Sequence, residues 1–212
     1  MEAFFSHCVY VGRGLAVTLE LLAGGFFIGA TLGALLAVLR YNGVGVAFIK
    51  GFVSLIRGTP LILQLSLIYF AAPGLIGLRL EMLSAGIIAF GINSAAYVAE
   101  ILRGGIESLP LGQFEAAQTL EIPRFFLWKD IILPQVFRNI FPSMVNEVIS
   151  LLKETALISV IGGLDVMRAA SMLSAEQFTY FMPLCIAGGY YYLLVLLIEW
   201  IGRTIERSHH QH

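Results

Sequence analysis

Long apolar runs restrict the folding of this 212-residue sequence more than any other feature. Residues 15–39 contain one charged side chain, Glu20, and at about 1.5 Å of helical rise per residue they can cross a hydrocarbon core about 30 Å thick. Charged residues make up 13% of the chain and hydrophobic residues 58%, whereas about 25% of a typical soluble protein is charged. One small core cannot bury so much apolar surface. The sequence therefore predicts an all-α integral membrane protein with a single domain over residues 1–212.

Five runs are suited to crossing a bilayer. The first is longer than the apolar region of roughly 7–15 residues in a secretory signal peptide, so we do not expect it to be cleaved. Pro73 and Gly74 should bend or end the second helix, and Pro142 should kink the fourth or delay its start. The predicted spans are residues 15–39, 61–78, 83–102, 136–161 and 182–201, with 40–57 as a short connector, 171–180 outside the membrane or at its interface, and 202–212 as a frayed tail.

Small residues recur every four positions in the first span, at Gly25, Gly29, Gly33 and Ala37. Such a stripe lies on one face of a helix and allows a neighbouring helix to approach closely within a membrane. We expect this face to pack against another span rather than to bind a ligand.

The basic residues predict the orientation, because cytoplasmic loops carry an excess of lysine and arginine. With the N-terminus outside and five spans, nine of the thirteen fall on the cytoplasmic side, three fall outside and Lys153 lies within a span. The outer residues are Arg13, Arg79 and Arg168. The cytoplasmic residues are Arg40, Lys50, Arg57, Arg103, Arg124, Lys129, Arg138, Arg203 and Arg207.

Polar side chains within the third and fourth spans are candidates for a transport pathway, since polar groups at membrane depth usually face a bundle interior or a water-filled cavity. In the third span they follow helical spacing on one face, and in the fourth they occupy two neighbouring faces. Two alternatives stay open: Asn93 could bond to a neighbouring helix, and Lys153 could form a salt bridge with a carboxylate. The candidates are Asn93, Tyr97, Glu100, Asn146, Glu147, Lys153 and Glu154.

The stretch from Gly112 to Pro134 is the longest polar interruption between the runs. It mixes charged side chains with aromatic ones, such as Phe125 and Trp128. This mixture is typical of a short helical hairpin that is pressed against a surface or a partner, although an ordinary solvated connector could share it.

Glu115-Ala116-Ala117, Ile131 and Leu133-Pro134 within this stretch resemble the EAA motif of permeases driven by ATP-binding cassettes. The spacing is that of the family, except that Glu121 stands where the family usually has glycine. Arg57-Gly58-Thr59-Pro60 with Gln64, the block NSAAYVAEILRGGIES and the block LLKETAL are similar to polar amino-acid permeases, so the resemblance covers nearly the whole chain. It implies a coupling helix that contacts the ATPase through Gly112, Glu115, Ala116, Ala117, Glu121, Leu133 and Pro134.

The resemblance also implies a function and a set of partners. The chain would be the permease subunit of a histidine, glutamine or arginine importer in the bacterial cytoplasmic (inner) membrane. Two permease subunits, identical or different, would work with two ATPase subunits and a periplasmic binding protein, and ATP and magnesium would bind to the ATPase. Leu133 and Pro134 would restart the membrane helix, and the two alanines would allow close approach to the ATPase.

The sequence has no Gly-Lys pair and so no G-x-x-x-x-G-K-[ST] phosphate loop, which argues against ATP hydrolysis by this chain. We expect no catalytic residue, no cofactor and no nucleic-acid partner. Cys8 and Cys185 are expected to pack, and His209, His210 and His212 to belong to the tail rather than to a metal site. An ion-coupled carrier or channel, and a structural membrane subunit without a pathway, are the alternative functions.

Glu121 carries one local prediction. A residue other than glycine costs roughly 1–2 kcal/mol in the left-handed region of backbone conformation. We therefore expect Glu121 to have a negative φ within a slightly remodelled turn.

Overall fold

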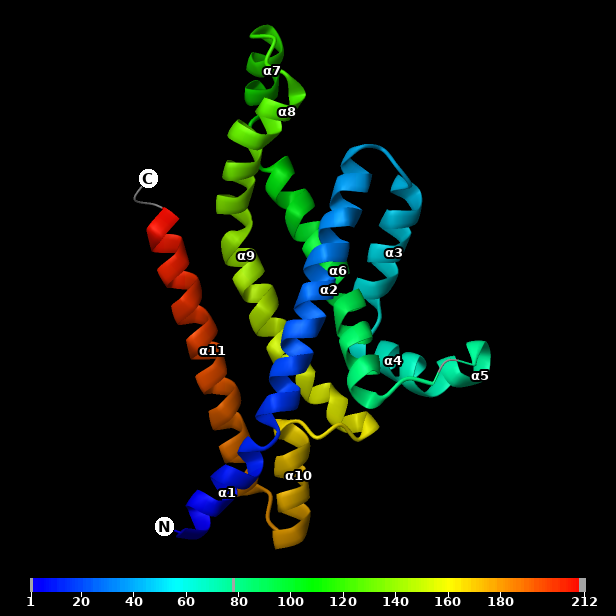
Figure 1. Ribbon diagram of the computed structural model, residues 1–212, viewed down its shortest axis with the longest axis vertical. Coiled ribbons are helices and arrows are strands. Elements are labelled where there is room, and N and C mark those ends of the chain that lie inside the picture. Colours follow the sequence, from blue (N-terminus) through cyan, green and yellow to red (C-terminus); the bar gives the residue numbers. More distant parts are fainter. Residues whose placement is uncertain (1, 78, 210–212) are drawn as a thin grey trace.

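The computed structural model describes residues 2–77 and 79–209, which form helices and no strand. Four long helices, α2, α6, α9 and α11, run roughly along the longest axis (Figure 1). The elements are α1 (Glu2–Gly12), α2 (Leu15–Tyr41), α3 (Val46–Gly58), α4 (Leu61–Ser66), the π turn η1 (Leu67–Ala71), α5 (Ala72–Ile76), α6 (Met82–Glu107), α7 (Leu111–Thr119), α8 (Arg124–Phe126), the π turn η2 (Leu127–Ile132), α9 (Leu133–Glu154), the 3₁₀ segment η3 (Thr155–Ile161), α10 (Val166–Gln177) and α11 (Phe181–His209).

Within the described residues, three helical segments are long and apolar enough to cross a membrane, namely Phe4–Tyr41, Met82–Glu107 and Phe181–Arg207. Two further pairs meet these criteria together but are bent, by 102° between α3 and the α4–α5 segment and by 50° before α10. Counting each bent pair as one span gives five, as the sequence predicts. The all-α membrane fold is thus confirmed.

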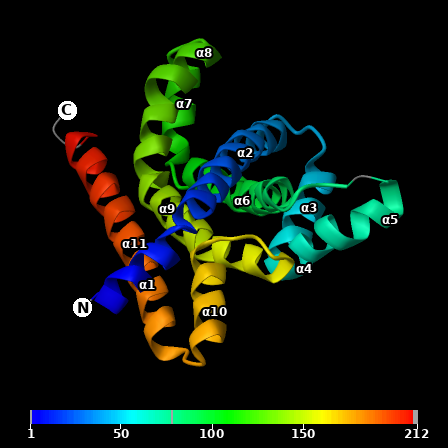
Figure 2. The same cartoon turned by 60° about the horizontal axis from the view of Figure 1, so that its bottom comes forward.

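Residues 40–57 are not a short connector, and that prediction is wrong. After a loop with Gly43 and Gly45 at positive φ, α3 folds back beside α2 (Figures 1 and 2). A strongly amphipathic sequence explains this, because Ile49 and Val53 are buried on one face and pack with Ala96 and Ala99 of α6.

Gln64 holds the sharp corner between α3 and α4. Its side-chain amide donates hydrogen bonds to the carbonyl oxygens of Ile56 at 2.8 Å and Thr59 at 3.2 Å. Pro60 immediately precedes α4, where its missing N–H costs no helical hydrogen bond. Farther on, the π turn η1 interrupts the helix before Pro73, and Gly77 ends it at a φ of 69°.

The small-residue stripe of α2 packs against α6, as predicted. A Cβ atom on Gly29 would lie 2.5 Å from the Cβ of Ser94, and one on Gly33 would lie 2.8 Å from the carbonyl oxygen of Ala95. Gly25 and Ala37 are buried at the two ends of the same stripe. Hence the backbones of α2 and α6 lie close together at these glycines.

A buried carboxylate, Asp165, stabilises the end of the molecule that contains α1 and α10. Its oxygens accept hydrogen bonds from the backbone amides of Arg168 at 2.8 Å and Met167 at 3.2 Å, which caps α10. The hydroxyl of Tyr191 on α11 donates to the same carboxylate at 3.0 Å. This cap therefore joins α10 to α11, opposite the end that carries α7 and α8 (Figure 1).

Two predictions about helix ends are wrong. The segment after residue 202 is not a frayed tail, because α11 continues to His209 and the buried Gly202 would place a Cβ 3.0 Å from Val145. Of the two effects predicted for Pro142, a kink or a late start, the late start is wrong, because α9 is continuous through this residue. His210 and His212 lie outside the described residues.

Candidate functional site

The stretch predicted to form a hairpin does so at one end of the molecule. Helices α7 and α8 project beyond the other helices (Figure 1). Leu109, Ala117, Leu127 and Ile132 are buried in one apolar cluster with Val136 and Ile140 of α9, and Ile101, Leu102 and Ile106 of α6 pack against it. The hairpin is therefore an ordered extension of α6 and α9 rather than a loose connector.

Glu121 ends α7 in the left-handed conformation, with a φ of 55°. The amide of Ile122 donates to the carbonyl oxygen of Ala117 at 3.0 Å, and the amide of Glu121 donates to that of Gln118 at 3.1 Å. These two bonds form a Schellman helix end, which needs a positive φ at this position. The negative φ predicted for Glu121 is therefore wrong, because the helix end outweighs the conformational cost of the side chain.

The three residues of the Glu115-Ala116-Ala117 motif do not face the same way. Glu115 and Ala116 are exposed, as is Gly112, whereas Ala117 is only 3% exposed and packs inside the hairpin. The expectation that both alanines approach a partner is thus wrong for Ala117. Its small side chain instead allows α7 to pack against the returning segment.

Leu133 begins α9 and Pro134 lies in its first turn. The segment before them is already helical from Arg124, however, and passes through the π turn η2. The amide of Leu133 donates to the carbonyl oxygen of Trp128, five residues earlier. The helix is therefore widened before the proline rather than restarted by it.

A polar cavity of about 350 Å³ lies between α6 and α9, away from the hairpin. Asn93 is 4% exposed and Glu147 is 8% exposed, while Asn146 and Ser150 are exposed. The lining residues are Asn93, Tyr97, Ile101, Ser143, Asn146, Glu147, Ser150 and Glu154. The structure thus brings together five of the seven residues predicted for the pathway.

Two hydrogen bonds connect the walls of this cavity. The hydroxyl of Ser94 donates to Glu147 at 2.7 Å, and the side-chain amide of Asn93 donates to Glu154 at 3.4 Å. The lining includes two carboxylates and no basic side chain. Carboxylates at membrane depth need a compensating partner, so the cavity is suited to a ligand that carries a positive charge.

Lys153 does not line the cavity, and its side chain is exposed. Within the part of the chain that the structure describes, no ion pair joins it to a carboxylate. The salt bridge that the sequence leaves open for Lys153 is therefore not formed among the described residues. The helical spacing explains this, because Lys153 follows Leu152, which is buried, and precedes Glu154, which turns toward α6.

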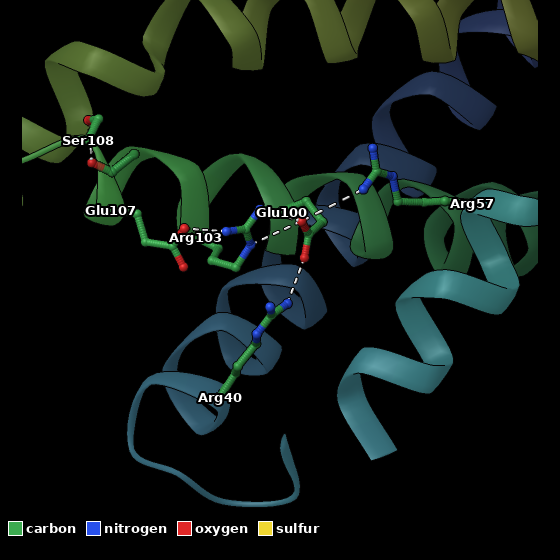
Figure 3. A network of polar contacts seen from close by, with 7 residues as sticks. Arg40, Arg57, Glu100, Arg103, Glu107 and Ser108 are labelled. Carbon is green, nitrogen blue, oxygen red and sulfur yellow. Dashed lines mark hydrogen bonds and ion pairs between the residues drawn. The ribbon is translucent and has the colours of Figure 1, made fainter. Parts of the chain in front are cut away.

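Glu100 lies outside the cavity, at the centre of an arginine network (Figure 3). Its carboxylate is 2.6 Å from the guanidinium of Arg40 on α2, 2.8 Å from that of Arg103, and 3.7 Å from that of Arg57 on α3. Arg103 also pairs with Glu107. The network joins the ends of α2 and α3 to α6.

Sequence reasoning missed several residues around these sites. Ser94 gives no signal because small residues are common in packed membrane helices, and in the sequence only the family resemblance distinguishes Gln64. The sequence pattern places Arg40 and Arg57 in a connector, although a glutamate near the end of a span together with several arginines could indicate an ion-pair network. No group of three or more potential metal-ligating side chains occurs among the described residues.

Comparisons with known proteins agree with this architecture. Residues 29–210 match the family described as the binding-protein-dependent transport system inner membrane component. A Rickettsia typhi protein named as a glutamine transport system permease is 46% identical over 97% of this chain and 95% of its own length. The arginine transport system permease protein ArtQ of Bacillus subtilis is 42% identical over 94% of this chain and 92% of its own length.

A solved structure titled as an amino acid ABC transporter with histidines is similar along the same length. Its TM-score is 0.89 at 34% identity, and the match covers 97% of each chain. The family match, the relatives and the fold thus agree over nearly the whole sequence. The chain belongs to the family of binding-protein-dependent transport system inner membrane components, the multi-pass membrane subunits of ABC transporters.

Proposed function

We propose that this chain is the permease subunit of an ATP-driven importer for a polar amino acid, with glutamine and arginine as the first candidates. The polar cavity between α6 and α9 carries this proposal, because its volume of about 350 Å³ is at the small end of ligand sites, which range over roughly 300–1,000 Å³. The names of the relatives support an amino acid as the cargo.

In this proposal Glu147 and Glu154 bind the positively charged group of the amino acid. Hydrogen bonds to charged groups contribute about 1.5–3 kcal/mol each, so two carboxylates would give the cavity a strong preference for an ammonium or guanidinium group. Asn93, Tyr97 and Asn146 supply neutral polar contacts around it. Glu100 and Lys153 do not line the cavity and do not bind the substrate in this proposal.

The hairpin is the proposed contact with the ATPase subunit. Glu115 and Ala116 are exposed on α7, beside the exposed apolar side chains of Leu111 and Leu120, which are 75% and 71% exposed. A polar residue among exposed apolar residues is typical of a protein contact surface. The assembly would contain a second permease subunit, identical or different, two ATPase subunits that bind ATP and magnesium, and a periplasmic binding protein.

Uptake of radiolabelled glutamine and arginine into proteoliposomes tests this function. The chain is reconstituted with its cognate ATPase and binding protein, and we expect uptake that requires ATP. Glu115→Lys combined with Ala116→Lys should reduce ATPase co-purification and uptake by at least about tenfold, since bulky charges would fill the contact surface. Glu154→Gln should lower uptake by about tenfold through weaker substrate binding while ATPase co-purification is unchanged.

Glu176→Lys on α10 is the matched control for ATPase co-purification. It reverses an exposed carboxylate at the end of the molecule opposite the hairpin, so association with the ATPase should be unchanged. Uptake by this chain without any ATPase would identify an ion-coupled carrier or channel and contradict the proposal. Unchanged ATPase association in the Glu115/Ala116 variant would contradict the assigned contact surface.

A further inference from the structure

We infer that the base of the hairpin binds an anionic phospholipid. A basic pocket and an apolar groove adjoin there, and neither is the cavity assigned to the amino acid. The basic pocket holds the phosphate of the headgroup, and the apolar groove holds part of an acyl chain. This inference goes beyond the proposed transport function and does not depend on it, because it concerns a different surface of the chain.

The basic pocket has a volume of about 950 Å³. Its lining comes from α7, from the segment between α8 and the start of α9, and from the end of α2. Arg124 and Lys129 are its basic side chains, and no carboxylate is among the described residues that line it. Glu121 and Asp130 are close in sequence but do not contribute to the lining. The pocket therefore has a net positive charge.

The charges of Arg124 and Lys129 are not neutralised within the part of the chain that the structure describes. The ion pairs found there involve other residues, and the ammonium group of Lys129 lies 5.8 Å from the centroid of the Phe125 ring. Both basic side chains are exposed. Guanidinium and ammonium groups bind phosphate oxygens well, so the pocket is suited to a phosphate group.

The apolar groove has a volume of about 410 Å³ and lies among the last turns of α2 and α6 and the start of α9. Its described lining contains no charged side chain, and Val38 and Phe137 in it are 57% and 61% exposed. The groove and the basic pocket adjoin at four residues that line both, namely Tyr41, Asn42, Trp128 and Leu133. A soluble anion would use only the pocket, whereas a phospholipid uses the pocket and the groove together.

The junction lies at the level expected for lipid headgroups. Tyr41 is the last residue of α2, at the end of a segment that is long and apolar enough to cross the membrane. Its ring meets that of Trp128 edge to face, with 4.6 Å between the centroids. Tyrosine and tryptophan are enriched at membrane–water interfaces. Basic pockets between helices on the cytoplasmic side are typical sites for anionic headgroups, and the hairpin lies at the end predicted to be cytoplasmic.

The lipid site and the proposed ATPase contact use different residues of the hairpin. Phe114 and Ala117 line the basic pocket from α7, and Ala117 is only 3% exposed. Glu115 and Ala116, the residues proposed to contact the ATPase, do not line the pocket. A lipid at this site is therefore compatible with the assembled complex.

Tryptophan quenching tests binding at the junction. The chain has two tryptophans, so Trp200→Phe leaves Trp128 as the only reporter. This full chain is placed in phosphatidylcholine nanodiscs with a small fraction of either phosphatidylglycerol or phosphatidylcholine that carries brominated acyl chains, which quench a tryptophan on contact. Each basic side chain beside an anionic lipid contributes about fivefold in binding. We therefore expect half-maximal quenching at a fraction of brominated phosphatidylglycerol about twentyfold lower than that of brominated phosphatidylcholine.

Arg124→Gln combined with Lys129→Gln should reduce this preference to within about twofold. The matched control combines Lys50→Gln with Arg138→Gln. It removes the same charge from two exposed residues on the side predicted to be cytoplasmic, and neither residue lines the pocket or the groove. The control should keep the preference of wild type. Equal loss in the two double variants would overturn the inference, since the lipid would then be attracted only by the overall charge of the surface.

Soluble competitors distinguish a lipid site from a site for a free anion. Inorganic phosphate and glycerophosphoglycerol, which is the same headgroup without acyl chains, are added in excess at constant ionic strength. Neither should reverse the quenching by brominated phosphatidylglycerol, because neither can occupy the groove. Reversal by either compound would overturn the inference in favour of a soluble anion.

Native mass spectrometry of the complete complex with its ATPase provides a second measurement. With phosphatidylglycerol added, the wild type and the Lys50/Arg138 variant should retain bound lipid, whereas the Arg124/Lys129 variant should lose it and still associate with the ATPase. Loss of ATPase association in the Arg124/Lys129 variant alone would overturn the inference, because these residues would then belong to the docking surface. Lipid binding by the free chain but not by the complex would also overturn it, since the ATPase would then cover the site.

Discussion

At the scale of single residues, backbone hydrogen bonds can determine a residue's conformation against the preference of its side chain. Glu121 adopts a φ of 55° because the amides of Glu121 and Ile122 close the end of α7 on Gln118 and Ala117. The family usually has glycine here, which adopts this conformation without a steric cost. The hairpin of this chain therefore retains local strain at the tip of its proposed contact surface.

Replacing Glu121 with glycine should stabilise this turn. We expect Glu121→Gly to slow hydrogen exchange at the amide of Ile122 by about fivefold, which corresponds to about 1 kcal/mol of relieved strain. Hydrogen exchange measured by mass spectrometry on peptides from the hairpin provides the comparison with wild type.

Glu121→Ala separates the backbone effect from the loss of charge. Alanine removes the carboxylate but retains the Cβ atom that makes the left-handed conformation costly, so exchange should not slow. Equal slowing in the glycine and alanine variants would show that the charge, rather than the φ of 55°, limits the stability of the turn.

At the scale of helices, the sequence predicts what depends on local pattern and misses what depends on tertiary contact. The glycine stripe correctly predicts that α2 packs closely against another helix, because period four is visible in the sequence, but it does not identify α6 as the partner. At α3 the sequence indicates only a connector, since the apolar face of this helix is short and its fold back beside α2 is fixed by distant residues of α6.

For the candidate site, too, the sequence predicts what depends on local pattern and misses what depends on tertiary contact. Asn93 and Glu147 could be selected as buried polar residues from span depth and spacing alone. The sequence could not predict that Glu100 and Lys153 lie outside the cavity, because this depends on the position of Arg40 and on the rotation of α9. Likewise Ala117 is part of a recognisable motif, but its burial inside the hairpin appears only when Leu127 packs against α7.

The α2–α6 contact makes a prediction for Gly33. In Gly33→Ala the new Cβ would lie 2.7 Å from the Cβ of Val98 and 2.8 Å from a backbone oxygen, so the helices must separate. We expect a loss of about 1–3 kcal/mol, the usual cost of overpacking, and a lower thermal unfolding midpoint for the protein in detergent.

Gly51→Ala on α3 is the control for this measurement. No heavy atom outside its own helix lies within 4 Å of the Cβ that this change adds, so the unfolding midpoint should stay the same or rise slightly. Equal destabilisation by the two changes would contradict the view that close packing, rather than glycine flexibility, accounts for the effect at Gly33.

At the scale of the whole molecule, the two ends differ in ways that agree with the predicted orientation. The N-terminal helix α1 and the last turn of α11 lie at opposite ends, as an odd number of spans requires (Figure 1). The hairpin lies at the end predicted to be cytoplasmic, and the turn at Phe178 between α10 and α11 lies at the other.

Cysteine labelling tests this orientation directly. In a variant with Cys8→Ser and Cys185→Ser, we expect Phe178→Cys to react with a membrane-impermeant maleimide in intact cells, because Phe178 is 95% exposed on the outer side. Gly112→Cys on the exposed surface of α7 should react only after the membrane is permeabilised. The reverse pattern would put the hairpin out of reach of a cytosolic ATPase.

The close contact between α2 and α6 also limits which parts of the molecule can change their relative position. The glycines of α2 lie directly against Ser94 and Val98 of α6, so the two helices cannot slide past each other without a steric clash, and we expect them to move as one rigid body. A transport cycle must then place its relative motion at the boundary with α9. Few relative movements are then open to the subunit. The amino acid would be enclosed or released as α9 shifts against the α2–α6 pair.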